Sequence, residues 1–140
     1  MKIARRLALG AAMVAVPGLA FAGQASAATT IPFQFNISPF GNPNGSFDAA
    51  AAHCVAVVDE QPGVALITGA DQGNWGCSIS ANIQWINLST GATGAAQMSN
   101  GLNGIPAAAT LYTGSGQVAL IMTPAGSSIS TPGLASFFVP

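Results

Sequence analysis

The chain has 140 residues, of which 50% are hydrophobic and only 5% are charged. An ordinary soluble domain has about 25% charged residues. All three basic side chains, Lys2, Arg5 and Arg6, lie within the first six positions, so the rest of the chain contains no Lys or Arg. A domain without cationic side chains cannot neutralise phosphate charge. The composition therefore excludes nucleic acid and phosphate ligands as partners.

The N-terminal segment has the three parts of a secretory signal peptide. The basic residues precede an apolar stretch at 7–22, and small residues follow it up to Ala27. This pattern predicts removal of residues 1–27 on export, with Ala22 as the alternative cut. The apolar stretch is shorter than the roughly 20 residues of a spanning helix, which argues against an uncleaved anchor. We expect no transmembrane segment in the mature chain. The leader is bacterial in style and indicates a secreted or cell-envelope-associated protein.

The predicted mature chain, 28–140, has the length of one domain and carries only acidic side-chain charges. These charges are Asp48, Asp59, Glu60 and Asp71. Such a surface favours cations, uncharged ligands or further copies of the same chain as partners.

Two cysteines, Cys54 and Cys77, remain in a chain directed to an oxidising compartment. We therefore expect a disulfide between them, which would stabilise the fold by about 3 kcal/mol. The competing hypothesis is a nucleophilic Cys54 activated by the neighbouring His53. Successive side chains of a strand point to opposite faces, so this hypothesis is disfavoured.

The first predicted strand covers residues 30–37, where apolar and polar residues alternate. Pro32 lacks a backbone donor, which places this strand at a sheet edge. The apolar positions, expected on one face, are Ile31, Phe33, Phe35 and Ile37.

After a loop rich in Pro and Gly, a second strand is predicted at 51–58, although residues 49–52 could instead form one helical turn. Residues 59–63 have the composition of a turn. The segment that follows, 64–68, is short and apolar, which is typical of a central strand covered on both faces.

The clearest alternation lies at 77–85, where every odd position is apolar. Ile86 and Leu88 then reverse the alternation, which predicts a β-bulge or a strand that changes sheets. A turn at 113–116 is predicted to form a hairpin with the strand after it. Residues 124–133 are expected to be a loop with a short edge strand. The remaining predicted strands are 95–99, 107–112, 117–123 and 134–139.

This pattern of seven or eight short antiparallel strands without a helix predicts an all-β fold. We expect a single small β-sandwich of immunoglobulin-like architecture, with a small β-barrel as the alternative. The sequence Val-Ala-Leu-Ile occurs at 64–67 and again at 118–121. Either a duplicated half-domain or the narrow residue choice of buried strands would explain the repeat.

His53 is the only imidazole in the chain, so any catalytic triad would have to include it. No Gly-x-Ser-x-Gly elbow accompanies it. We therefore predict no catalytic residue and a non-enzymatic protein, with a small secreted hydrolase that uses His53 as an alternative.

Asp59 and Glu60 precede the predicted strand at 64–68, and Asp71 follows it. Loops at neighbouring ends of a sheet could share one calcium ion through these carboxylates. A calcium-dependent adhesion or binding module is therefore a further alternative, although the spacing matches no known calcium loop and we predict no cofactor.

Trp75, Asn74 and Tyr112 are the candidate binding residues, because aromatic rings among uncharged polar groups commonly hold glycans or apolar ligands. The predicted mature chain also has no Lys with which to protect its strand edges, which favours homo-oligomers. From the sequence we thus expect a protein that binds an uncharged glycan or lipid of the cell envelope, or that self-associates.

Overall fold

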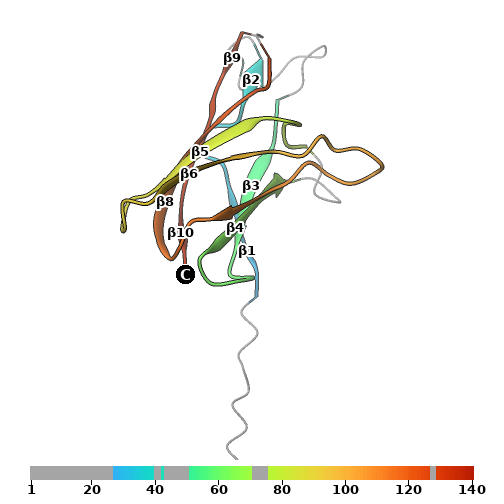
Figure 1. The fold of residues 1–140 in the computed structure, drawn as a ribbon. Helices are drawn as coiled ribbons and strands as arrows, with labels where there is room; N and C mark the ends of the chain where they lie inside the picture. Colours follow the sequence, from blue (N-terminus) through green and yellow to red (C-terminus); the bar gives the residue numbers. More distant parts are fainter. Residues whose placement is uncertain (1–26, 40–41, 43–50, 71–75, 127–128) are drawn as a thin grey trace, which may run out of the picture.

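The computed structural model describes residues 27–39, 42, 51–70, 76–126 and 129–140. These residues form ten strands in three antiparallel sheets and contain no helix (Figure 1). The predicted all-β class is confirmed. Neither of the two larger sheets closes on itself, so the small barrel offered as the alternative is not formed.

The first sheet has the strand order β1-β3-β4-β7. Its strands are β1 (Thr29–Pro32), β3 (Cys54–Val58), β4 (Val64–Gly69) and β7 (Ala109–Tyr112). Two predictions are confirmed here, because Pro32 lies on an edge strand and β4 is central. The β3–β4 turn contains Asp59 and Gly63, both with a φ of 73°.

The second sheet has the order β10-β8-β5-β6. Its strands are β5 (Asn82–Asn87), β6 (Thr93–Gln97), β8 (Gly116–Thr123) and β10 (Gly133–Val139). A third, two-stranded sheet pairs β2 (Ser38–Pro39) with β9 (Ser130–Thr131), which is the short strand expected within 124–133.

The chain passes from the first sheet to the second just after β1. Phe35 donates its backbone N–H to the carbonyl of Leu134 at 3.1 Å, and Leu134 donates back to Phe35 at 2.7 Å. The predicted strand at 30–37 is therefore broken into two parts. Phe33 and Ile37 are buried as expected, but the Phe35 side chain is 66% exposed, which corrects its predicted place on the buried face.

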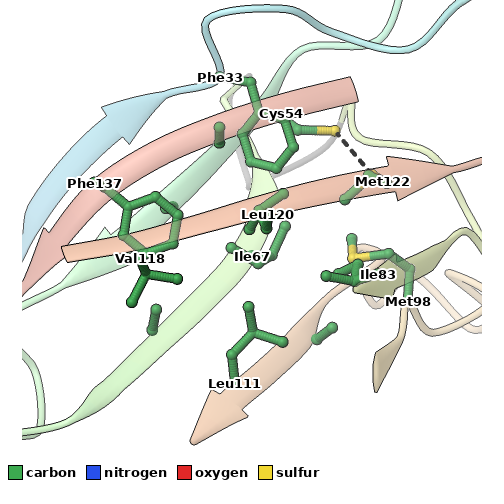
Figure 2. Packing of buried hydrophobic residues seen from close by; sticks show 14 of the residues in the cluster. Phe33, Cys54, Ile67, Ile83, Met98, Leu111, Val118, Leu120, Met122 and Phe137 are labelled. Carbon is green, nitrogen blue, oxygen red and sulfur yellow. Dashed lines mark hydrogen bonds between the residues drawn. The ribbon is translucent and has the colours of Figure 1, made fainter. Parts of the chain in front are cut away.

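The hydrophobic core lies between the two four-stranded sheets, and β4, β8 and β10 contribute alternate residues to it (Figure 2). Its largest fully buried apolar side chains are Ile67, Ile83, Leu111, Met122, Val118 and Val139. Cys54 Sγ lies 3.9 Å from Met122 Sδ. A disulfide sulfur has no hydrogen to donate, so this is a van der Waals contact that packs the two sheets together.

The expected disulfide between Cys54 and Cys77 is confirmed, with the two Cα atoms 4.6 Å apart. Cys54 begins β3 of the first sheet, and Cys77 precedes β5 of the second. The bridge therefore ties one sheet to the segment that leads into the other.

Strand β5 is shorter than the predicted strand at 77–85, and its alternation does not reverse. Residues 77–81 lie outside it, and Ile79 is exposed. The inward positions continue regularly through Trp85 to Asn87, while Ile86 and Leu88 point outward. The predicted bulge was wrong, because a buried polar residue occupies the position where an apolar one was expected.

Asn87 is fully buried, and both ends of its amide are used. Its Nδ2 donates to the carbonyls of Thr113, Gly114 and Ser115 at 3.0, 3.3 and 3.0 Å. Its Oδ1 accepts from the backbone N–H groups of Ser89 and Thr90 at 2.9 and 3.1 Å. One side chain thus fixes two turns at the same end of the molecule.

The turn at 113–116 is not the predicted hairpin. It joins β7 of the first sheet to β8 of the second, and these strands do not pair. In a hairpin, the carbonyls of the turn would be satisfied by hydrogen bonds between the two paired strands. Here the Asn87 amide donates to the carbonyls of the turn instead.

The two Val-Ala-Leu-Ile segments present opposite faces to the core. In β4 the inward residues are Ala65 and Ile67, whereas in β8 they are Val118 and Leu120. A shift of one residue exchanges the two faces of a strand, so the segments occupy different structural positions. This favours the limited residue choice of buried strands as the cause of the repeat.

Candidate functional site

The structure does not bring the sequence-predicted binding residues together. Trp75 and Asn74 lie outside the described residues. Tyr112 is on the edge strand β7, and its side chain is 75% exposed on the outer face of the first sheet.

The predicted calcium ligands are also only partly described. Asp59 is half-buried and Glu60 is exposed in the β3–β4 turn, whereas Asp71 lies outside the described residues. Within the described ranges, no group of three or more His, Cys, Asp or Glu residues is placed to hold a metal ion. The calcium site therefore remains a prediction from the sequence.

His53 directly precedes β3 and is exposed. Its backbone is held on both sides, since its N–H donates to Gly76 at 2.7 Å and its carbonyl accepts from Ala70 at 2.8 Å. Its imidazole has no hydrogen-bond partner among the residues that the structure describes. Among the described residues, no Ser, Asp or Glu side chain is hydrogen-bonded to His53, so no catalytic triad is seen there.

A different surface has the properties of a binding site, namely the outer face of the second sheet. Antiparallel pairing brings the outward side chains of its strands into one layer. These side chains are apolar, amide or hydroxyl groups without a formal charge. They are Asn82, Gln84, Ile86, Thr93, Ala95, Gln97, Gln117, Ala119, Ile121, Thr123, Leu134, Ser136 and Phe138.

The charged side chains of the described residues, Asp59 and Glu60, both lie in the β3–β4 turn of the first sheet. The outer face of the second sheet therefore offers a ligand no counter-charge. Transfer of an ion to such a surface would cost hydration without an ion pair in return.

A shallow groove of about 690 Å³ crosses this face. It is lined by Gln84, Trp85, Ile86, Thr93, Gly94, Ala95, Ala119, Leu120, Ile121 and Leu134. Leu134 also lines a second groove of about 520 Å³, together with Phe35 and Pro132. The two grooves thus meet at β10, where the N-terminal segment joins the second sheet.

The Trp85 indole fits against the edge strand because its cross-strand partner is a glycine. Trp85 pairs with Gly94 of β6. A Cβ atom on Gly94 would lie 2.4 Å from Cζ2 of Trp85, so any larger residue would displace the ring. Gly94 therefore sets the position of a half-buried indole on the inner face of the sheet, directly behind the strands that line the groove.

Polar side chains are held in place along β10. The Ser136 N–H donates to Oε1 of Gln34 at 2.7 Å, and Nε2 of Gln117 donates to the Ser136 hydroxyl at 2.8 Å. Phe138 lies opposite Gln117 in the pairing of β10 with β8 and keeps 58% of its surface exposed. The β10 edge of this outer face therefore combines ordered, uncharged polar groups with an exposed aromatic ring.

Sequence reasoning missed this site, although β8 contains a usable signal. Residues 118–122 are all apolar, a pattern that is typical of a strand covered on both faces. The core covers Val118, Leu120 and Met122, but Ala119 and Ile121 lie on the outer face. A strand with apolar residues at both odd and even positions, but with only one face covered, exposes apolar surface on its other face. Such exposed apolar surface marks an interaction site.

Comparison with protein-family models, curated proteins and solved structures found no match to this chain. No membrane-spanning helix is found in the part of the chain that the structure describes.

Proposed function

We propose that this chain is an exported, non-enzymatic β-sandwich domain of immunoglobulin-like architecture that binds an uncharged, largely apolar ligand or surface. The binding site is the groove on the outer face of the second sheet. The observation that carries the proposal is the uncharged, apolar lining of this groove.

The lining determines the class of ligand. Ile86, Ile121 and Leu134 supply apolar surface, and burying such surface is the main favourable term in binding. Gln84 and Thr93 add hydrogen-bonding groups that suit hydroxyl, amide or ester groups. A neutral lipid or an uncharged glycan of the cell envelope has this combination of apolar and polar groups.

Two features support export. Residues 1–27 have the order of charge, apolar stretch and small residues that is typical of a signal peptide. The Cys54–Cys77 disulfide is the form that cysteines adopt in oxidising compartments.

Trp85 provides an indirect readout of ligand binding, because it belongs to the strand that lines the groove while its half-buried indole packs against the core behind it. With Trp75→Phe as the background, Trp85 is the only tryptophan in the chain. The oxidised protein is titrated with monoacylglycerol as a lipid without phosphate, with Nile red as an uncharged apolar probe, and with neutral polysaccharides. We expect a saturable change in Trp85 fluorescence with at least one of these ligands.

A matched pair of variants then locates the site. Ile121→Gln replaces an apolar groove side chain and is expected to weaken binding about tenfold, given roughly 0.8 kcal/mol for each buried CH₂ group. Tyr112→Gln makes a comparable change on the outer face of the first sheet and should leave binding unchanged. Absence of any fluorescence change, or equal loss in both variants, would refute the proposal.

A further inference from the structure

The outermost strands of the two main sheets differ in how well their free edges are protected. β1 contains Pro32, which has no N–H to offer to another strand. β10 is bridged by Phe35, and the Gln34 side chain accepts from the N–H of Ser136. β7 has four residues, and the Ser99–Ala108 hydrogen bonds occupy the backbone at its start.

Along Thr93–Gln97, β6 has none of these protections, since the Ser99–Ala108 hydrogen bonds begin two residues after its end. Its sequence, Thr-Gly-Ala-Ala-Gln, contains no proline and no charged side chain. It lies at the edge of the second sheet, where only β5 pairs with it. Uncharged, unprotected edge strands are templates for pairing with another strand.

The hydrogen bonds at both ends of β6 identify which of its groups are free. The backbone N–H of Asn87 donates to the carbonyl of Ala92 at 2.7 Å, and the backbone N–H of Met98 donates to the carbonyl of Ala81 at 2.8 Å. The even-numbered residues of β6 therefore exchange backbone hydrogen bonds with β5. Because an antiparallel ladder alternates, the backbone groups of the odd-numbered residues of β6 point away from β5. These outward groups belong to Thr93, Ala95 and Gln97. They have no backbone partner among the described residues.

We propose that two copies of this chain pair through β6, antiparallel, with Ala95 on the two-fold axis. In this register Ala95 lies opposite Ala95 of the second copy, and Thr93 lies opposite its Gln97. The free backbone N–H groups of one strand then donate to the free carbonyls of the other. This interface goes beyond the proposed function and does not depend on a bound ligand.

The side chains in this register fit a second copy as the occupant. No like charges oppose each other, since the strand has no charge. The pairs are Ala with Ala on the axis and Thr with Gln on either side, which can hydrogen-bond across the strands. On the inner face Gly94 lies opposite Ala96 of the second copy, so no bulky side chain separates the backbones.

The pairing would join the two four-stranded sheets into one sheet of eight strands. Thr93 and Ala95 line the groove of each copy, so the two grooves would meet at the axis. The dimer thus offers one continuous uncharged surface in place of two separate ones. A short edge contact buries little area, which makes the association weak and dependent on concentration.

Charge reversal on the axis tests both the interface and its register. In Ala95→Lys two lysines would face each other, and in Ala95→Glu two glutamates would do so. Residue 95 is exposed on the outer face, so we expect both variants to fold with the disulfide intact. Thr110→Lys, on the other exposed edge strand β7, is the matched control.

Sedimentation velocity without any ligand, from about 5 to 500 µM protein, measures the association by mass action. We expect the parent chain and Thr110→Lys to shift from monomer towards dimer, and each Ala95 variant alone to stay monomeric. An equimolar mixture of Ala95→Lys and Ala95→Glu should restore the dimer, with a stronger effect at low salt. Amide hydrogen exchange should show concentration-dependent protection at Ala95 and none at Thr110.

Three results would overturn the proposal. These are a monomeric parent chain at every concentration, loss of the dimer in Thr110→Lys, or no recovery on mixing the two Ala95 variants. Because no ligand is present, each of these failures leaves the groove proposal to be judged by its own fluorescence titration.

Discussion

Replacing Asn87 by alanine tests whether one buried amide holds the two sheets together at their shared end. The side chain makes five hydrogen bonds, three as donor and two as acceptor. Each contributes about 1 kcal/mol net, and a buried group left without a partner costs 1–3 kcal/mol. Water can reach the carbonyls of the exposed turn residues, so we expect a loss of about 3–4 kcal/mol in the free energy of unfolding.

This loss is a large fraction of the 5–15 kcal/mol of a typical domain, and it corresponds to a fall of roughly 15 °C in melting temperature. Urea unfolding followed by circular dichroism measures it. Asn82→Ala is the matched control, because Asn82 lies on the same strand but is exposed. A loss below about 1 kcal/mol in Asn87→Ala, or one equal to that of the control, would refute the reasoning.

Asn87→Asp separates the donor role from the acceptor role. A carboxylate can still accept from Ser89 and Thr90, but it cannot donate to the turn carbonyls. Burial beside these carbonyls would raise the pKa of the new carboxyl above its unfolded value. The penalty is absent below the unfolded pKa and grows as pH rises towards the folded pKa, so the variant should approach the parent stability at acidic pH. A constant difference from pH 4 to pH 7 would contradict this.

Three further predictions follow from close contacts in the fold. Gly94→Ala should displace the Trp85 indole, because its Cβ would lie 2.4 Å from the ring; an unchanged near-ultraviolet circular dichroism spectrum would argue against this packing. Gly116→Ala should cost about 2–3 kcal/mol in urea unfolding, since Gly116 has a φ of 134° and its Cβ would lie 2.7 Å from the Cβ of Ser89; a neutral effect would show that the turn can relax. Reduction of the Cys54–Cys77 bridge should lower stability by about 3 kcal/mol, and equal urea midpoints with and without reductant would exclude this.

The sequence correctly predicted the features that depend on only a few neighbouring residues or on one residue type. The central strand β4, the turn before it and the edge position of Pro32 follow from apolar runs, turn residues and a missing donor. The disulfide was predicted from two cysteines in a chain whose first residues have the pattern of a leader segment. Each of these features needs information from only a few residues.

The wrong predictions depended on contacts between distant segments. Hydropathy alone cannot show that Asn87 is buried, because the three carbonyls that its Nδ2 bonds lie 26 to 28 residues later in the turn at 113–116. The exposure of Phe35 depends on a bridge to Leu134, which lies on β10 at the other end of the chain. The groove was missed for the same reason, since its lining comes from four strands whose order in the sheet is not their order in the sequence.

The disulfide also has a mechanical consequence. It closes a covalent loop with a sequence separation of 23 residues, and this loop contains the paired strands β3 and β4. A force applied to the two ends of the chain passes through the bridge and leaves this hairpin unloaded. At about 3.4 Å per extended residue, the oxidised chain would stretch to a length roughly 75 Å shorter than the reduced one. A pulling experiment would therefore record the redox state of the protein as a difference in contour length.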